Sequence, residues 1–338
     1  MDNIQQYKGF GIVFDGYSKE ISADMALDSA LLTETNAGVP VALTTYVDPV
    51  IIDILTAPLR ARAIATERKM GDWTTSFAQF TMVEKTGFTQ PYDDYADNGV
   101  ADINANFPVR QNYVFETVIG YGDKEVETAG KAKLDLISRK QQSAANTLDM
   151  AMNDFYFYGV SGLANYGILN EPNLPTALTP ANVGTEDTPK TKWTDKTAQQ
   201  IYSDILAMVT DIATRSRGII DSNSKFKLVV SPAINSRLLD SPTQMLTTVI
   251  ATVKGAIPNL EVVVAPQMST NAGELVQLWA EVVSTNGNSN KTMELAFSEK
   301  MRAGRVIPSL SHFKQKFTAG TFGAVIYQPY AVSQMLGV

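Results

Sequence analysis

The sequence predicts an α+β fold built from a long antiparallel hairpin, one long helix and a separate α/β lobe. Two runs of alternating residues, Trp73 to Val83 and Val109 to Tyr121, are typical of paired strands. From Thr194 onward, helical and strand-like patterns alternate over about 110 residues, which is typical of an α/β unit. Hydrophobic residues make up 44% of the 338-residue chain, enough for more than one core.

The long helix is predicted from a stretch without proline. From Val126 to Phe155, apolar residues recur three or four positions apart, and no proline lies between Gly120 and Gly159. This pattern predicts one helix of about thirty residues or more, roughly 50 Å long. We expect Leu148 to pack against the strand-like stretch that returns later in the chain. The residues expected in the core of this spine helix are Ile137, Leu148, Met152 and Phe155.

Between the two predicted strands lies a polar, turn-rich stretch, Glu84 to Pro108. A loop of this length in a compact domain is usually functional, and we expect it to reach another molecule. Its carboxylates greatly outnumber its one lysine, Lys85. The acidic residues expected at its tip are Asp93, Asp94 and Asp97.

The remaining segments follow from capping and turn signals. Residues 1–45 are expected to form an N-terminal arm with one short helix, Ser22 to Leu32. Residues 46–70 are expected to form a connecting helical segment interrupted at Pro58. This segment ends in a basic group made of Arg60, Arg62, Arg68 and Lys69.

In the α/β lobe, the pattern predicts a helix over 198–212 closed by Gly218, and a strand over 226–230. Ser231-Pro232 and Ser241-Pro242 each predict the start of a helix, the second ending at Gly255. Further strands are predicted at 260–265, 275–283 and 293–297. A basic strand-like stretch is predicted at 299–317, which includes Lys300 to Lys316, then a strand at 321–327 and a short helix opening at Pro329.

The composition argues against several kinds of chemistry. The formal net charge is −7, so the whole molecule lacks the basic field that drives nucleic-acid binding. There is no cysteine and only one histidine, His312, which leaves little for thiolate or histidine metal sites. A nucleophile elbow at Gly159 would need glycine at position 163, where Leu163 stands. We therefore expect no catalytic, cofactor-binding or metal-binding residues. No apolar run approaches the ~18 residues of a membrane-spanning helix.

The order of the segments, and one local motif, carry a resemblance. The motif is Phe155-Tyr156-Phe157-Tyr158-Gly159 at the end of the spine helix, followed by Gly167-Ile168-Leu169-Asn170 and Pro172. Along nearly its whole length, the chain resembles the major capsid proteins of tailed double-stranded DNA bacteriophages, which have the Hong-Kong-97-like (Johnson) fold. The resemblance implies that residues 71–122 are the extended hairpin called the E-loop. It also implies a peripheral domain at 123–158 and 299–317, and an axial domain at 159–298 and 318–338.

The resemblance implies a non-enzymatic structural subunit that self-assembles, as pentamers and hexamers, into an icosahedral head. Packaged DNA is enclosed rather than specifically bound, no membrane is involved, and the protein is expected in the virion after assembly in the host cytoplasm. A separate scaffolding protein, a portal and a decoration protein are the implied partners. An encapsulin-like protein nanocompartment is a second interpretation, and a carboxylate-dependent hydrolase in the α/β lobe is a third.

The charge pattern suggests a docking hypothesis. The acidic tip, Asp93, Asp94 and Asp97, is expected to meet a basic surface of the adjacent subunit. Its first candidate is the group Arg60, Arg62, Arg68 and Lys69, and the second is the Lys300 to Lys316 strand.

Overall fold

The computed structural model describes residues 59–95, 99–132, 134–184, 190–240, 248–283 and 289–338. The predicted N-terminal arm, its helix and most of the connecting segment lie outside the described residues, as do Asp97 and the helix start at Ser241. Of the connecting segment, the structure describes a short helix, α3 (Ala61–Ile64), which leads into the first strand.

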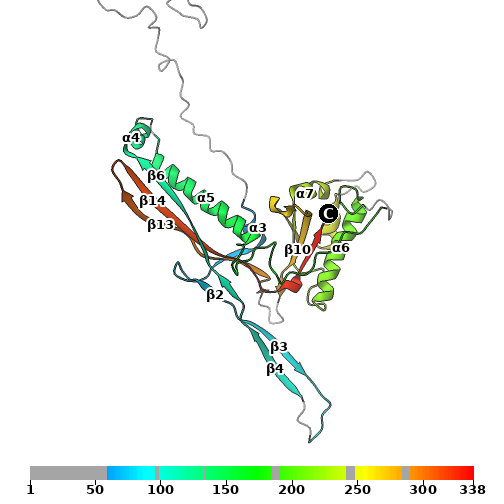
Figure 1. Ribbon diagram of the computed structural model, residues 1–338. Helices are drawn as coiled ribbons and strands as arrows, with labels where there is room; N and C mark the ends of the chain where they lie inside the picture. The colour runs from blue at the N-terminus through cyan, green and yellow to red at the C-terminus, as the bar shows by residue number, and fades with distance from the viewer. Residues whose placement is uncertain (1–58, 96–98, 133, 185–189, 241–247, 284–288) are drawn as a thin grey trace, which may run out of the picture. The chain divides into compact units, whose positions relative to one another are not determined.

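A four-stranded sheet forms one part of the fold, in the order β1-β13-β14-β6 (Figure 1). Its strands are β1 (Thr66–Lys69), β6 (Tyr113–Gly122), β13 (Met293–Pro308) and β14 (His312–Ile326). β1 runs parallel to β13, and the other neighbours are antiparallel. Helix α5 (Leu136–Tyr158) packs along one face of this sheet, and their apolar side chains share one core.

The prediction of one continuous spine helix was wrong, because the chain forms two helices, α4 (Asp123–Lys131) and α5. The break has a local cause. Gly130, a weak helix former, stands in the last turn of α4, and Leu134 N donates to Ala129 O, a closing pattern that ends a helix. Asp135 then caps α5 by accepting from Ser138 N at 3.2 Å. The spine is therefore 23 residues, roughly 35 Å at ~1.5 Å per residue.

The hairpin is more divided than predicted. Its strands are β2 (Phe77–Gln79), β3 (Met82–Phe88), β4 (Val100–Asn106) and β5 (Val109–Gln111). β2 pairs with β5, and β3 with β4, so both sides of the expected loop form a β-ribbon. The second predicted strand, Val109 to Tyr121, is interrupted at Asn112: β5 belongs to the hairpin, and β6 pairs with β14. The many turn-forming residues near the tip masked the short strand patterns of β3 and β4 in the sequence.

The returning segment also differs from the prediction. The strands expected at 293–297, 299–317 and 321–327 are two long strands, β13 and β14, joined by a turn at 309–311. Ser309 N donates to His312 O at 2.8 Å and closes this turn. Bulges interrupt the register between Ala296 and Val306, which explains why no single alternation runs through the sequence of β13.

The α/β lobe contains a five-stranded sheet in the order β15-β10-β7-β8, with β9 also paired to β10. Helices α6 (Ala198–Arg215), α7 (Pro232–Leu238) and α8 (Val249–Ala256) surround a second core with it. Its strands are β7 (Phe226–Val230), β8 (Leu260–Val264), β9 (Ser269–Thr270), β10 (Gly273–Ala280) and β15 (Val332–Leu336). Two smaller strands, β11 (Val282–Val283) and β12 (Ser289–Asn290), pair beside it, and the short 3₁₀ turn η2 (Pro266–Met268) precedes β9.

The short terminal helix predicted at Pro329 was wrong beyond its first turn. Only η3 (Pro329–Ala331) is helical, and the chain then enters β15, which pairs with β10. Tertiary pairing overrides the helix-start signal of a proline here. The second predicted helix of the lobe is described from α8 onward, where Thr248 accepts from Ala251 N at 3.3 Å.

Candidate assembly surfaces

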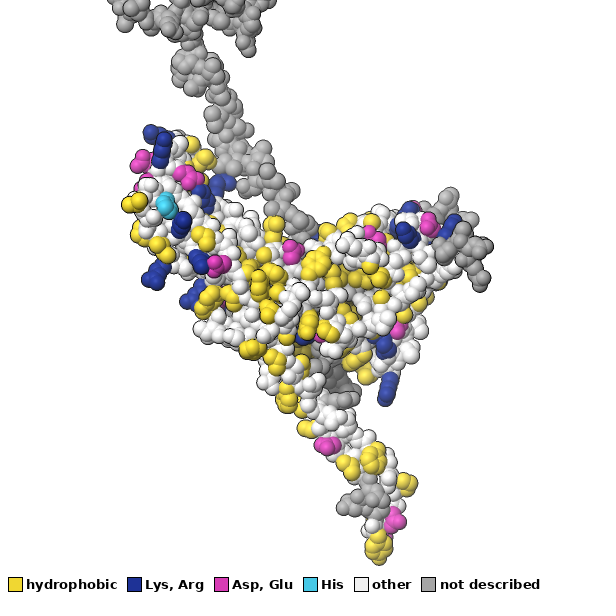
Figure 2. Space-filling view, viewed as in Figure 1, with side chains coloured by type: hydrophobic (Ala, Val, Ile, Leu, Met, Phe, Trp, Pro, Cys, Tyr) yellow, Lys and Arg dark blue, Asp and Glu magenta, His cyan; other side chains and the backbone are white. Residues whose placement is uncertain are grey.

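The ribbon formed by β3 and β4 projects away from the rest of the described chain, and its side chains are largely exposed (Figures 1 and 2). Large apolar residues are among them: Phe88 is 58% exposed, and Tyr95 at the tip is 99% exposed. Such a surface on a soluble protein marks an interaction site. The exposed large apolar residues of the ribbon are Val83, Phe88, Tyr92, Tyr95, Val100 and Ile103.

The predicted acidic tip is exposed but its two described carboxylates are already engaged locally. Asp93 Oδ1 accepts from Tyr95 N at 3.0 Å, and Asp94 Oδ1 accepts from the Tyr92 hydroxyl at 2.5 Å. This bond raises the pKa of Tyr92. Asp94 therefore holds the Tyr92 side chain, Asp93 holds the backbone at Tyr95, and the described tip carries two tyrosines beside its two carboxylates.

The proximal end of the ribbon is anchored by a buried ion pair. Arg110 of β5 donates to Glu171 Oε2 at 2.6 Å, and the Arg110 guanidinium stacks 4.7 Å from the centre of the Tyr166 ring. Next to it, Gln111 N donates to Ala164 O at 2.9 Å. The sequence does not reveal this anchor, because an arginine in an alternating strand gives no sign of burial. Glu171 lies in the segment that carries the resemblance.

The structure explains why glycine and asparagine occur in this segment, which follows α5. Asn170 Oδ1 accepts from Gly167 N at 2.6 Å, and Asn170 Nδ2 donates to Tyr158 O at 2.7 Å. The side-chain amide thereby closes the turn onto the end of α5. Gly159 has φ +63°, and a Cβ at Gly167 would lie 2.3 Å from Phe157 O. Only glycine fits both positions without displacing the backbone.

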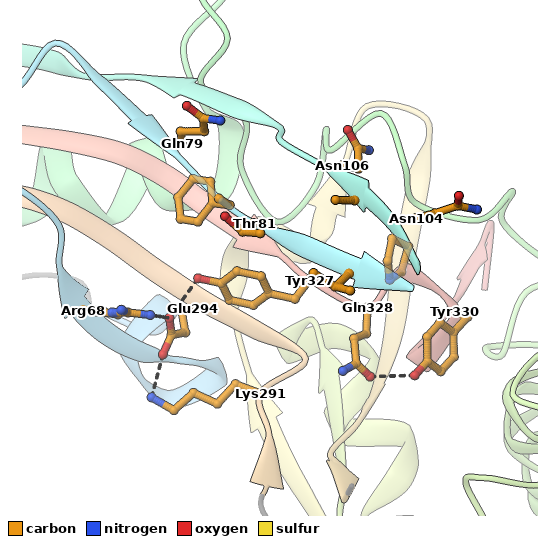
Figure 3. A pocket seen from close by; sticks show the side chains of 14 residues that line it. Arg68, Gln79, Thr81, Asn104, Asn106, Lys291, Glu294, Tyr327, Gln328 and Tyr330 are labelled. Carbon is orange, nitrogen blue, oxygen red and sulfur yellow. Dashed lines mark hydrogen bonds and ion pairs between the residues drawn. The ribbon is translucent and has the colours of Figure 1, made fainter. Parts of the chain in front are cut away.

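A groove of about 1430 Å³ lies beside the base of the ribbon (Figure 3). Glu294, 2% exposed, forms its charged centre and accepts from Lys291 at 2.6 Å, Tyr327 at 3.0 Å and Arg68 at 3.2 Å. Burial raises the pKa of Glu294, but these three hydrogen bonds outweigh burial and hold the pKa below its ordinary value. Burial beside Glu294 raises the pKa of Tyr327.

The first group of basic candidates is used within the chain. Arg62 pairs with Glu67 at 2.9 Å and Asp149 at 2.7 Å, Arg68 with Glu294, and Lys69 with Glu299 at 3.0 Å. Arg60 differs, because its Nε is buried without a hydrogen-bond partner among the described residues. A carboxylate from an adjacent subunit would therefore meet three cations that already have ion-pair partners within their own chain.

The second basic candidate, the Lys300 to Lys316 strand, is a hairpin rather than one strand. Lys300 pairs with Glu67 at 2.5 Å, Lys316 pairs with Glu116 at 2.7 Å, and Arg302 stacks 5.1 Å from the centre of the Trp73 ring. Within the described ranges, Arg305 and Lys314 have no carboxylate at ion-pair distance, and both are exposed.

The four residues predicted for the core of the spine helix differ in how deeply they are buried. Leu148 and Met152 are 2% and 1% exposed and share a core with Ile119 of β6 and Phe317 of β14. Phe155 is half-buried, with its ring centre 4.9 Å from that of Phe115. Ile137, near the start of α5, is also half-buried.

The described residues contain no group of His, Cys, Asp or Glu that could hold a metal ion. None of the helices in the described part of the chain is both long and apolar enough to span a membrane.

A mixed α/β subunit with a spine helix on a long sheet, a projecting ribbon and an α/β lobe defines a phage capsid protein of the Hong-Kong-97-like fold. The chain belongs to the family of the Pa193 gp26 major capsid protein, whose profile matches residues 30–337. It is therefore a major capsid protein: a non-enzymatic component of the virion that forms the shell of a phage head.

Solved capsid structures show the same fold at low sequence identity. The capsid of Myoviridae phage XM1 is 11% identical, covers 88% of this chain and 98% of its own, and gives a TM-score of 0.69. The capsid of the native GTA particle is 11% identical with a TM-score of 0.59, covering 93% and 100%. Microbacterium phage Oxtober96 is 12% identical with a TM-score of 0.57, covering 90% and 99%. No curated protein matches the chain in sequence.

Proposed function

We propose that the β3–β4 ribbon is the main contact by which one subunit holds the next in the shell. The observation that carries this proposal is the ribbon's row of exposed apolar side chains, including Phe88 and Ile103, which the described chain does not cover. Burial of this surface against a second copy is favourable by ~25 cal/mol per Å² of apolar area, before the costs of association. Many such contacts per shell make moderate affinities collectively strong.

The finer domain division belongs to this proposal. Residues 71–122 act as the E-loop, 123–158 with 299–317 as the peripheral domain, and 159–298 with 318–338 as the axial domain that gathers as pentamers and hexamers. One hydrophobic cluster, around α6 and the lobe sheet, lies wholly within the proposed axial domain, whereas the other runs from α5 and the long sheet to the face of the lobe sheet that carries Val229 and Trp279. Residues 1–45 remain the proposed N-terminal arm, and 46–70 the connecting segment.

The tip carboxylates Asp93 and Asp94, with Asp97, add an electrostatic part to the contact. Arg60, Arg62, Arg68 and Lys69 remain the first proposed partners. Because three of these four cations already have carboxylates in their own chain, each added pair is expected to contribute only about 0 to 1 kcal/mol. The apolar residues of the ribbon therefore provide the larger share.

A separate scaffolding protein, a portal and a decoration protein are further proposed partners, and DNA is held by enclosure. The test of the proposal is negative-stain microscopy and light scattering of the full chain at micromolar concentration, with and without its scaffold. Closed shells or capsomer-like rings are expected. A compact monomer under both conditions would contradict the proposal.

A further inference from the structure

A pocket lies where the α/β lobe meets the first strand of the long sheet. It has a volume of about 510 Å³ and is called here the junction pocket. Residues from the end of α3, the start of β1 and the start of β13 line it, together with residues of the lobe strands β7, β8 and β10. Its volume suits a small molecule, since sites for such ligands usually measure ~300–1,000 Å³.

The register of the lobe sheet explains how the pocket is built. Trp279 of β10 pairs with Lys227 of β7, which pairs in turn with Glu261 of β8, so the three side chains share one face of the sheet. Lys227 Nζ donates to Ala63 O at 3.0 Å and to Ile64 O at 3.1 Å, both in α3. These bonds hold the lobe sheet against α3 beside the pocket.

The lining of the pocket is suited to an uncharged ligand. Each of its three lysines already has a carboxylate of the same chain nearby: Lys225 lies 3.7 Å from Glu281, Lys227 lies 3.9 Å from Glu261, and Lys291 lies 2.6 Å from Glu294. An ionic ligand would have to compete with these pairs, whereas an apolar ligand would contact the buried side chains directly. The buried apolar residues that line the pocket are Ile64, Ala65, Phe226, Trp279, Ala280 and Met293.

One polar group of these lining residues lacks a partner. Trp279 is 4% exposed, and its indole Nε1 is buried without a hydrogen-bond partner among the described residues. An N–H donor buried without an acceptor costs free energy, and an acceptor on a bound molecule would recover it. The aromatic rings of Trp279 and Phe226 also favour a flat aromatic ligand.

We propose that the junction pocket binds a small uncharged aromatic molecule that carries a carbonyl acceptor. The ring packs against the buried apolar side chains, and the Trp279 indole N–H donates to the carbonyl oxygen. Because the lobe and the start of β1 both contact the occupant, binding links these two parts and stabilises the folded chain. This site belongs to the single folded chain, so it does not depend on the shell function proposed above.

The test uses prodan, an uncharged naphthalene ketone whose emission moves to shorter wavelength in an apolar site. Titration of the full unassembled chain should show this shift and saturate. Thr66 is exposed and lines the pocket, so Thr66→Trp should obstruct the pocket without disturbing the core and weaken binding at least about tenfold. Val118→Trp, at a 52% exposed strand position of β6, is the matched control and should keep the wild-type affinity.

A second variant tests the hydrogen bond. Trp279→Phe keeps an aromatic wall but removes the N–H donor, so the affinity for prodan should fall about fivefold. The same naphthalene amine without its ketone should bind this variant and the wild type equally. Circular dichroism checks that each variant is folded.

Binding that does not saturate, or equal affinity of Thr66→Trp and the wild type, would overturn the proposed site. Equal affinity of a folded Trp279→Phe variant for prodan would overturn the role of the indole N–H. If Trp279→Phe does not fold, the comparison of Thr66→Trp with Val118→Trp still decides whether the site exists. A chain that binds prodan in this way but never assembles would contradict the shell function alone.

Discussion

Arg110 and Glu171 form an ion pair at 2.6 Å in which the side chains are only 8% and 0% exposed. The pair joins the base of the β3–β4 ribbon to the turn that follows α5. Asn173 Nδ2 donates to the second carboxylate oxygen at 3.2 Å, so Glu171 is hydrogen-bonded on both sides. The direction in which the ribbon leaves the subunit is thus set by a buried charge interaction.

Breaking this pair should be costly. Glu171→Gln leaves the Arg110 charge buried without a counterion, and we expect the free energy of unfolding to fall by ~3–5 kcal/mol in urea denaturation. Glu281→Gln, which breaks the exposed pair with Lys225 at 3.7 Å, should change it by less than ~1 kcal/mol. A loss at Glu171 no greater than that at Glu281 would show that the ribbon is anchored by other contacts.

Substitutions on the spine helix α5 can test which of its faces is buried. Leu148→Asp places an unpaired charge in the core shared by α5, β6 and β14, at a cost of ~4 kcal/mol, and should prevent soluble folding. Met150→Asp, on the same helix but 41% exposed, should remain soluble. Expression and circular dichroism of the two variants measure the difference. Normal assembly of Leu148→Asp would mean that the helix faces another way.

The apolar ribbon predicts an assembly defect without a folding defect. Phe88→Ser combined with Ile103→Ser removes two exposed apolar side chains, so thermal unfolding of the unassembled subunit should be unchanged. The concentration needed for assembly should rise by tenfold or more, roughly the effect of losing ~1.4 kcal/mol or more per contact. Light scattering against protein concentration provides the measurement. Assembly at the wild-type threshold would exclude the ribbon from the shell contacts.

The acidic tip predicts a smaller effect with a salt signature. Converting Asp93, Asp94 and Asp97 to Asn should leave the subunit folded and raise the assembly concentration modestly, since each exposed pair contributes only about 0 to 1 kcal/mol. Added salt should weaken assembly of the wild type more than that of the triple variant. If the wild type and the triple variant assemble at the same protein concentration and respond equally to salt, the three carboxylates are only solvated turn residues and make no subunit contact.

Glu294 predicts the pH dependence of stability near the ribbon base. Its pKa in the folded protein is held below the ordinary 4.5 by Lys291, Tyr327 and Arg68, so its ionised form stabilises the fold at neutral pH. This contribution is present above the pKa of the unfolded chain and is lost as pH falls through the lower folded value. Glu294→Gln should therefore lower stability at pH 7 and flatten its decline below pH ~4.5. Urea denaturation of the wild type and Glu294→Gln across this pH range is the measurement, with Glu261→Gln, on an exposed side chain, as the matched control for stability at pH 7.

Where the sequence predicted structure correctly, one local signal decided the outcome. The helix at α6 and the strand at β7 follow their patterns, because α6 starts at the capping residue Thr197 and buries one face, and β7 is a short apolar run buried on both faces. The spine was mispredicted at Gly130 and Asp135, where periodicity continues across a break in the helix. The spacing of apolar residues alone does not indicate such a break, whereas an aspartate that can cap a new helix, such as Asp135, does.

The assembly surfaces were less predictable. Arg62, Arg68 and Lys69 are basic in sequence, but their partners Asp149, Glu294 and Glu299 come from distant segments. No sequence pattern reveals such pairings before the chain folds. The exposed apolar face of the ribbon was also missed, because Val100 and Ile103 stand in the polar, turn-rich stretch 84–108 that was interpreted as a loop. A strand residue is exposed when no other part of the fold covers its face of the strand, and that depends on the tertiary arrangement.

The length of β13 and β14 has a mechanical consequence. Both strands run unbroken by loops from the turn at 309–311 to the α/β lobe, and β14 is also paired to β6 along ten of its residues. When a shell wall is stretched, a pull along the sheet loads these hydrogen bonds side by side, in shear. Bonds loaded in parallel share the force and fail together, whereas bonds opened one at a time from a strand end fail singly. The sheet is therefore stiffest along its strands, the direction in which it connects the two ends of the subunit.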